Sequence, residues 1–336
     1  MESIVSEVSI FNDAIKPIEF PKNHKESIAL IKDCYRFKPE GLIMKEEKWK
    51  YMIRNVYRGK SILLVGPSGF GKTMAVKMVQ NVFSRPKFFI NLGATQDPRT
   101  SLIGTTHFNK EVGTFFRKSY FIEAITTPDA VILLDELSRA HPDAWNILMA
   151  ILDPNQRYVR IDEDELHPTV PVADGVSFLA TANIGNEYTA TRTMDKALLE
   201  RFQIVEVDIL TQEEELKLLK YMFPSIKEKL LSAISKIAGE SREEINTEGA
   251  RISTMVSPRM SVEMASLLYD GFSMREAAAV AIYPHFSAEG GNNSERVFMS
   301  QLVQKHIPTE QQTGNPKDKT DGGLFTQEEV DNAFVH

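Results

Sequence analysis

One short stretch of the sequence has the residues to bind a phosphate group. It reads Gly66-Pro67-Ser68-Gly69-Phe70-Gly71-Lys72-Thr73, the G-x-x-x-x-G-K-T pattern. Glycines let the backbone curve tightly and approach a ligand closely. The lysine supplies positive charge to the outer phosphates of a nucleotide, and the threonine offers its hydroxyl to magnesium. The stretch therefore predicts a nucleotide-phosphate site with Mg²⁺.

The residues on either side of this stretch support that prediction. Residues 61–65 form an apolar run of strand length, and residues 74–80 carry apolar positions at helical spacing. A strand, a glycine-rich turn and a helix N-terminus in that order bring backbone N–H groups and the helix dipole onto an anion. We therefore predict that residues 66–74, ending at Met74, bind the nucleotide. The alternative, an ordinary glycine turn, is disfavoured by the Gly-Lys-Thr ending.

Two neighbouring carboxylates follow another apolar run. Residues 130–134 read as a parallel strand buried on both faces, and they lead directly into Asp135 and Glu136. Ligands of α/β sheets bind at the carboxyl ends of the strands. We expect Asp135 to hold the magnesium shell and Glu136 to act as the general base that orients and polarises an attacking water. The alternative is an acidic pair in a solvated turn.

The order of apolar runs predicts an α/β fold with a parallel sheet covered by helices across residues 46–210. A helix is expected over residues 46–57. A small hairpin or insertion is expected within residues 93–127, because residues 114–116 and 119–122 carry β-forming side chains. The segment 153–172 is polar and acidic and predicts a solvated hairpin or loop. The strand-like runs are at residues 61–65, 87–92, 130–136, 176–183 and 204–210, and the run at 87–92 reads as a buried strand.

The remaining residues divide into three further parts. Residues 1–45 are interpreted as an N-terminal extension, residues 211–303 as a small all-α domain, and residues 304–336 as a flexible tail. Thr211 and Ser273 each stand three residues before a glutamate, which is the capping-box pattern of a helix start. Thr326 repeats this pattern and predicts a short terminal helix.

Composition restricts the class of protein. A single cysteine excludes an intramolecular disulfide and a cysteine-based metal cage, and it suits a reducing interior. No apolar run has the length of a membrane span, so no membrane insertion and a cytoplasmic location are expected. The formal net charge of −7 gives no overall attraction to nucleic acid. The sequence has no N-K-x-D string of the kind that reads guanine, so ATP is the favoured nucleotide.

Over residues 46–285 the sequence resembles the MoxR-like group of AAA+ ATPases. This group includes the CbbQ and NirQ ATPases and the ATPase subunit of cobaltochelatase. GPSGFGKT and ILLDELSRA are similar to its Walker A and Walker B elements, and FLATAN, ALLERF and SPRM are similar to three further motifs in the family order. The fold that the resemblance implies is a P-loop AAA+ core followed by a small all-α lid domain. The segment around Asn183 reads Ala-Asn-Ile-Gly and lacks the Asn-Pro common in MoxR proteins; it is nearer the chelatase-subunit version, which leaves the subfamily open.

The resemblance implies roles for four further residues. Asn183 stands at the sensor-1 position, where an amide fixes the attacking water, although it could merely cap a turn. Arg201 stands at the position of a finger that reaches the neighbouring subunit's ATP; the alternative is a helix-end arginine in a surface ion pair. Arg259 stands at the sensor-2 position of the lid, although an arginine there would be unremarkable alone. Arg139 is either structural or part of an inter-subunit salt bridge. Arginine suits the charge of a transferring phosphoryl group because its fork is planar and always charged.

The resemblance also implies an assembly and a partner. Members of the group form rings, so we expect a homo-oligomer, a hexamer, with ATP between subunits. Hydrolysis would remodel or activate a protein client, which in this group is often a protein with a von Willebrand A-type domain. Two alternatives remain open: a nucleotide-switched scaffold with little turnover, and a nucleic-acid motor. The acidic run at residues 162–165 argues against the second, because it is a poor surface for phosphates.

Overall fold

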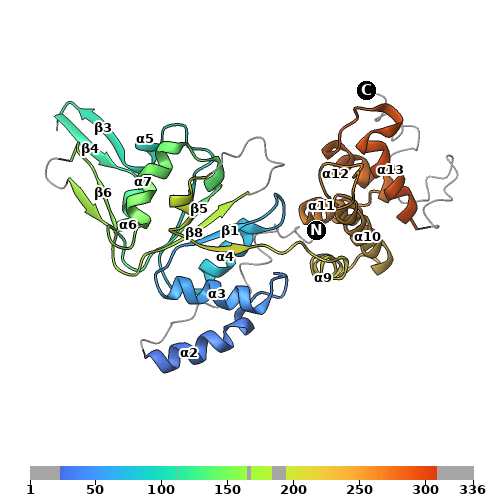
Figure 1. Cartoon of the computed structure of the whole chain (residues 1–336), viewed down its shortest axis with the longest axis horizontal. Coiled ribbons are helices and arrows are strands. Elements are labelled where there is room, and N and C mark those ends of the chain that lie inside the picture. The colour runs from blue at the N-terminus through green and yellow to red at the C-terminus, as the bar shows by residue number, and fades with distance from the viewer. Residues whose placement is uncertain (1–22, 112, 165–167, 184–193, 309–336) are drawn as a thin grey trace. The chain divides into compact units, whose positions relative to one another are not determined.

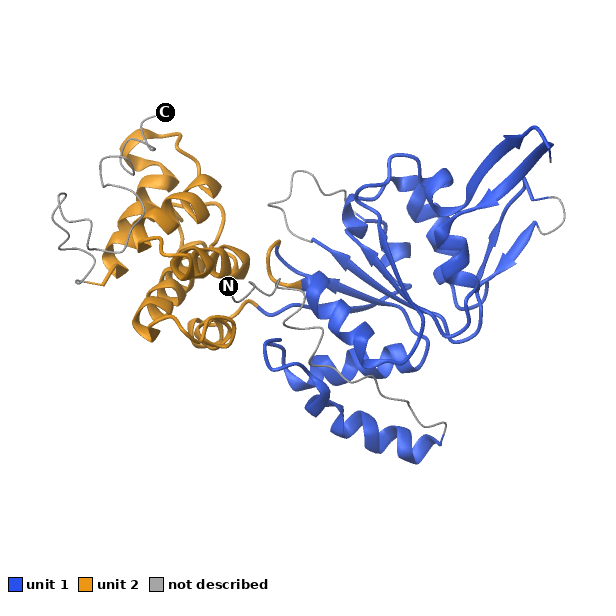
Figure 2. Ribbon diagram, turned by 180° about the vertical axis from the view of Figure 1, so that it is seen from behind, with its two compact units in different colours: residues 1–67, 72–208 blue, residues 68–71, 209–336 orange. Residues whose placement is uncertain are grey.

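The computed structural model describes residues 23–111, 113–164, 168–183 and 194–308. The chain forms two compact units (Figure 2): a core unit, residues 1–67 and 72–208, and a C-terminal unit, residues 68–71 and 209–336. In the described ranges, no helix is both long enough and apolar enough to cross a membrane.

The core unit contains a five-stranded sheet with the order β2-β5-β8-β1-β9 (Figure 1). Every neighbouring pair in this sheet is parallel. This arrangement confirms the predicted α/β class with a parallel sheet. The strands are β1 (Ile62–Val65), β2 (Lys87–Asn91), β5 (Val131–Asp135), β8 (Ser177–Ala182) and β9 (Gln203–Glu206).

The register of the three central strands aligns their carboxyl ends. Leu134 of β5 pairs with Ala180 of β8, so that Asp135 and Thr181 come next at the same edge of the sheet. On the other side of β8, Val65 at the end of β1 pairs with Ala182. The residues that follow β1, β5 and β8 are therefore brought together by the backbone itself.

Helices cover both faces of the sheet because alternate residues of each central strand point to opposite faces. Leu63 and Ile132 lie in one apolar cluster with residues of α6 (Tyr120–Thr126) and α7 (Pro142–Leu152). The intervening strand residues are also buried, and α3 (Glu46–Tyr57) and α4 (Lys72–Val82) contact the central strands. The helix predicted over residues 46–57 is confirmed.

The edge strand β2 differs from its predicted character. Residues 87–92 were expected to form a buried strand, but β2 is an edge strand whose residues alternate between exposed and half-buried. The Phe89 ring is 42% exposed, and the Lys77 ammonium lies 4.9 Å from its centroid. That contact covers part of an apolar ring at an edge that only one neighbouring strand protects. Apolar composition alone does not distinguish an edge strand from a central one.

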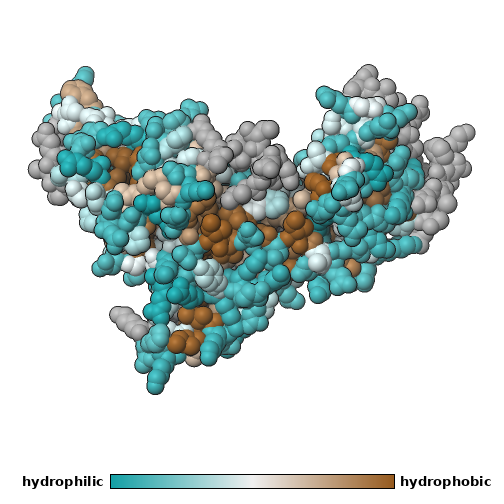
Figure 3. Space-filling model, in the orientation of Figure 1, coloured by the Kyte–Doolittle hydropathy of each residue, from teal (hydrophilic) through white to brown (hydrophobic). Residues whose placement is uncertain are grey.

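The insertion within residues 93–127 contains a hairpin, as predicted. The hairpin pairs the antiparallel strands β3 (Gly104–Asn109) and β4 (Gly113–Lys118), and the short helix α5 (Pro98–Leu102) precedes it. Phe108 near the turn is 74% exposed, and Figure 3 shows an apolar patch at the outer end of this hairpin. Residues 119–122 were expected to be β-forming, and this was wrong. They start α6, because Ser119 caps the helix by accepting from the N–H of Ile122.

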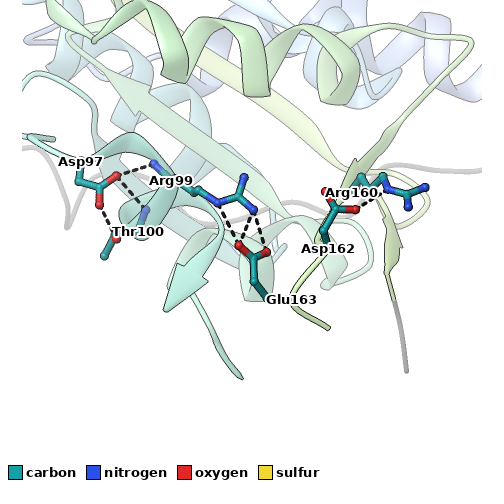
Figure 4. Close-up of polar contacts among 6 residues, drawn as sticks. All are labelled: Asp97, Arg99, Thr100, Arg160, Asp162 and Glu163. Atoms are coloured by element: carbon teal, nitrogen blue, oxygen red, sulfur yellow. Dashed lines mark hydrogen bonds and ion pairs between the residues drawn. The ribbon is translucent and has the colours of Figure 1, made fainter. Parts of the chain in front are cut away.

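A second hairpin carries the acidic run that was predicted to be a solvated surface. The hairpin pairs β6 (Tyr158–Arg160) with β7 (Thr169–Pro171). Each acid of the run that the structure describes forms an ion pair, two of which appear in Figure 4. The pairs are Asp162 with Arg160, Glu163 with Arg99, and Asp164 with Lys118. The hydrogen bond from Arg99 lowers the pKa of Glu163. Each of these carboxylates faces a cation, so the described part of the run is not an unbalanced acidic surface.

The C-terminal unit is helical, with one apolar cluster inside. Thr211 and Ser273 both form the predicted capping boxes, each accepting from the N–H of a glutamate whose side chain accepts in return. The expected helix at Thr326 lies outside the described residues, and so does most of the predicted tail. The helices are α9 (Gln212–Met222), α10 (Glu228–Glu244), α11 (Pro258–Tyr269), α12 (Met274–Ala281) and α13 (Glu295–His306).

Candidate nucleotide site

The phosphate loop, residues 66–73, connects β1 to α4. Gly69 and Gly71 have φ values of 80° and 73°, a left-handed conformation that glycine adopts without a Cβ penalty. Lys72 begins α4, and its Nζ donates to the carbonyl oxygens of Gly66 (3.0 Å) and Pro67 (2.6 Å). The ammonium is therefore held against the loop, with only 8% of the residue exposed.

Asp135 meets the phosphate loop at the end of β5. Its Oδ1 accepts hydrogen bonds from the Thr73 hydroxyl at 2.9 Å and from the Thr181 hydroxyl at 2.5 Å. The carboxylate is 8% exposed. Two oxygen groups expected to serve magnesium, the Thr73 hydroxyl and the Asp135 carboxylate, are thus in direct contact. No cluster of three or more His, Cys, Asp or Glu residues that could hold another metal occurs among the described residues.

Glu136 directly after the strand has a left-handed backbone, with φ 56° and ψ 41°. Its N–H donates to the Thr181 hydroxyl at 3.1 Å. Its carboxylate is partly exposed, and Oε2 lies 3.4 Å from Nη1 of Arg139. Gly93, which follows β2, packs so closely that a Cβ there would overlap the Glu136 carboxylate. The general-base candidate is therefore fixed at its backbone and crowded at its side chain.

Asn183 follows β8 and lies near the same edge of the sheet. Its backbone N–H donates to the hydroxyl of Ser138 at 3.1 Å. Ser138 belongs to the short 3₁₀ turn that follows Glu136 and is 1% exposed. The structure thereby ties the segment after β5 to the end of β8, and places the sensor-1 candidate close to the carboxylate pair.

Arg201 is held elsewhere in the core unit. It lies two residues after α8 (Lys196–Leu199), and its guanidinium donates to acceptors on α8 and at the end of α7. The acceptors are the carbonyl of Ala197 (2.6 Å), the carbonyl of Met149 (3.0 Å) and the carboxylate of Asp153 (3.1 Å). Within one chain Arg201 forms a partly buried ion pair with Asp153, and its role at a neighbouring subunit stays a prediction.

Arg259 lies within the C-terminal unit, to which residues 68–71 of the phosphate loop also belong. It is exposed in the first turn of α11, which Ser257 caps. A Cβ built on Gly69 would overlap the Ser257 side chain and would lie 3.5 Å from the Cβ of Arg259. The sensor-2 candidate is therefore beside the tip of the phosphate loop.

A buried arginine near Phe70 was not found by sequence reasoning. The Arg242 guanidinium lies 5.4 Å from the centroid of the Phe70 ring and forms an ion pair with Glu215. It also donates to the carbonyls of Leu210 and Val256. Burial raises the pKa of Glu215 in spite of this cation. Arg242 stands in the helical segment 228–244 without a motif around it, so the sequence offered no signal.

Three residues around the carboxylate pair were also missed: Gly93, Ser138 and Thr181. For Thr181 a signal existed. It is one of two hydroxyl residues, with Ser177, in the mostly apolar strand β8. It stands two positions before Asn183, and a buried hydroxyl needs partners. Gly93 and Ser138 stand in short connections whose course depends on the tertiary structure.

The fold and the site define a class of protein. A parallel sheet with a phosphate loop after β1, a carboxylate pair after β5 and an amide after β8 is the core of a P-loop nucleoside triphosphatase. Residues 61–202 match the AAA domain of the dynein-related subfamily.

Comparison with known proteins identifies the family. The chain is 31% identical to "Putative chaperone BssE" of Thauera aromatica over 227 residues, 66% of this chain and 74% of that protein. It is 28% identical to the chaperone protein ClpB of Mycoplasmoides gallisepticum over 184 residues, which is 52% of this chain and 24% of ClpB. The chain belongs to the AAA+ ATPase family. Among solved structures, the RuvB Holliday junction branch migration motor of Thermotoga maritima has a TM-score of 0.46 at 17% identity, covering 85% of this chain and 74% of that one.

Proposed function

We propose that this chain is a MoxR-like AAA+ ATPase that binds and hydrolyses ATP at the interfaces of a homo-oligomeric ring, a hexamer. The cycle would remodel or activate a protein client. The observation that supports this most is the 2.9 Å contact between Thr73 of the phosphate loop and Asp135, with Glu136 as the next residue. In this proposal the contact joins the phosphate-binding element to the acid that would bind the metal and to the residue that would act as general base.

The residues at this contact fit Mg²⁺. Magnesium prefers hard oxygen ligands and is bound by one or two protein groups together with phosphates and water. The Thr73 hydroxyl and the Asp135 carboxylate would hold it. When bound, the ion neutralises charge on the phosphate oxygens.

The other residues of the core unit then have separate tasks. The backbone of residues 66–74 surrounds the phosphates, and Lys72 exchanges its loop carbonyls for the outer phosphates of ATP. Glu136 orients the attacking water and accepts its proton. Asn183, tied to Ser138, fixes the same water from the end of β8.

Two arginines complete the proposed site. Arg259 beside the loop tip meets charge on the phosphates from its own chain. Arg201 acts on the ATP of the neighbouring subunit, for which it must leave the Asp153 carboxylate. Preorganised cations are needed because negative charge spreads over the equatorial oxygens of the transferring phosphoryl group.

The type of client is proposed from the relatives and from the resemblance. Two similar proteins bear chaperone names, which supports action on a protein. A client with a von Willebrand A-type domain rests on the resemblance to MoxR proteins. A cytoplasmic location and the absence of a nucleic-acid partner stay predictions. Stimulation of hydrolysis by DNA or RNA would contradict the second.

The experiment that tests the proposal replaces Glu136 with glutamine. The variant keeps the shape and polarity of the side chain and loses the base. We expect steady-state ATP hydrolysis to fall on the order of 10²- to 10⁴-fold while ATP binding is retained. Undiminished hydrolysis would overturn the assignment of Glu136. The same variant, held in its ATP state, is the bait for isolating the client.

A second candidate function is a nucleotide-switched scaffold with little turnover. The observation that favours it is that Arg201 already donates hydrogen bonds to three acceptors of its own chain. The two functions differ in how hydrolysis depends on protein concentration. A trans-acting arginine makes the rate per chain rise as the ring assembles, whereas a scaffold keeps a low rate at every concentration.

A further inference from the structure

One buried hydroxyl connects the two carboxylate residues of the candidate site. The Thr181 hydroxyl donates to Oδ1 of Asp135 at 2.5 Å and accepts from the backbone N–H of Glu136 at 3.1 Å. Thr181 is 2% exposed and lies in the strand next to Asp135. A single hydroxyl can donate one hydrogen bond and accept others, so both contacts can form together.

These contacts lie at a residue with an unfavourable backbone conformation, Glu136. Glu136 has a left-handed conformation, which a residue with a Cβ adopts only when its surroundings hold it. The hydrogen bond from its N–H to Thr181 holds the backbone from the side of β8. Gly93 leaves just enough room for the carboxylate on the other side. The direction of the Glu136 side chain therefore depends on the neighbouring strands.

We propose that Thr181 is a positioning residue for hydrolysis, which sets the orientation of the Asp135 carboxylate and the backbone of Glu136 relative to each other. This inference rests on the proposed ATPase function. Thr181 acts through the two acids that it contacts. Asn183, two residues further on, keeps its own separate tie to Ser138.

The decisive substitution is Thr181→Val, which keeps the shape and the strand preference of the side chain. It removes the donor to Asp135 and the acceptor for Glu136. Thr181→Ser restores both groups. The matched control is Ser177→Ala, because Ser177 lies in the same strand, is fully buried, and donates to the Val56 carbonyl at the opposite end of β8. Thr181→Val and Ser177→Ala each remove one buried hydroxyl.

Turnover and nucleotide binding should separate in these variants. In Thr181→Val we expect kcat to fall on the order of 10- to 100-fold, as is usual when a partner of a metal ligand is lost, with KM for ATP changed less than about twofold. Thr181→Ser should recover most of the rate, and Ser177→Ala should keep it. Equal kcat in Thr181→Val and Ser177→Ala would overturn the proposal.

A readout without turnover tests the same contact. Amide hydrogen exchange in the peptide that contains Glu136 should accelerate in Thr181→Val and stay slow in Thr181→Ser and Ser177→Ala. Unchanged exchange in Thr181→Val would overturn the proposal. If the valine variant does not fold, Thr181→Ala is measured in the same two ways, because it deletes the hydroxyl without adding a methyl group.

Failure of this inference differs from failure of the proposed function. If wild-type protein hydrolyses ATP, Glu136→Gln abolishes hydrolysis and Thr181→Val retains full kcat, only the role of Thr181 is wrong. If Glu136→Gln hydrolyses ATP as fast as wild type, the assignment of the base is wrong, and the hydrogen-exchange measurement still decides whether Thr181 holds Glu136.

Discussion

Two parts of the core unit contain residues predicted for the same reaction, and they are held in different ways. At the ends of β5 and β8, the sheet register places Asp135 in contact with Thr73 and Thr181. Near the start of β9, the guanidinium of Arg201 donates hydrogen bonds to backbone carbonyls on α7 and α8. The contacts of Asp135 are set by strand register and form within one chain. A long side chain at the end of a helix depends on which acceptors its own chain or a neighbour offers.

The largest effect should come from removing the arginine. Arg201→Ala should lower ATP turnover on the order of 10³-fold, the effect known for arginine fingers. The measurement is the steady-state rate at a protein concentration where the wild type is assembled. Arg160→Ala is the matched control, because that arginine is exposed and forms its ion pair with a surface acid two residues away. Equal rates in the two variants would mean that the contacts of Arg201 within its own chain are its whole role.

A smaller effect on ATP turnover is expected at the ends of β5 and β8, where strand register positions the acidic residues. Gly93→Ala places a methyl group against the Glu136 carboxylate and should turn that side chain away. We expect kcat to fall about tenfold, because small displacements of a catalytic group are costly. The melting temperature serves as the control and should change by less than about 2 °C, since Gly93 has no left-handed φ and lies in a surface connection. Full activity would show that Glu136 tolerates reorientation.

Releasing Arg201 from its own chain should raise the rate. Asp153→Asn weakens the ion pair that competes with a role in the neighbouring subunit. Because partly exposed ion pairs contribute up to about 1 kcal/mol, the rate per chain should rise by up to about fivefold when assembly is limiting. The measurement is ATPase activity across a protein dilution series. A loss of activity would instead indicate that Asp153 supports Arg201 in its working position.

The smallest effect concerns an ion pair without a catalytic assignment. Arg99 lowers the pKa of Glu163 from its ordinary value of 4.5, so this pair stabilises the fold above that pH and the stabilisation is lost as the pH falls through the folded pKa. Both side chains are largely exposed, and the effect should be well under about 1 kcal/mol. Melting temperatures of wild type and Glu163→Gln should differ slightly at pH 7 and converge once the pH falls below the folded pKa of Glu163. A difference that persists in acid would assign it to another contact.

The sequence predicted the parts of the fold that depend on local pattern. The buried runs of β1, β5 and β8 and the capping boxes at Thr211 and Ser273 are readable because apolar continuity and cap chemistry act over a few residues. The exposure of β2 was missed because an edge strand is defined by the strand it lacks. Residues 119–122 were misassigned because the Ser119 cap outweighed their β-forming side chains.

The same distinction holds in the candidate site. Thr73, Asp135 and Glu136 were predicted because each belongs to a contiguous motif. Thr181 and Gly93 were missed because their partners are distant in the sequence, and only the strand order β2-β5-β8 brings them together. The position of the Arg201 side chain could not be predicted either, since three acceptors from two helices determine it.

The central claim, an ATP site shared between subunits, is tested most directly by mixing two inactive variants. Lys72→Ala removes the ammonium that should contact the phosphates and keeps Arg201. Arg201→Ala keeps that ammonium and removes the guanidinium. A shared site predicts that each variant alone is inactive and that an equimolar mixture, assembled together, regains part of the wild-type ATPase activity. A mixture that assembles and stays as inactive as its components would contradict the shared site.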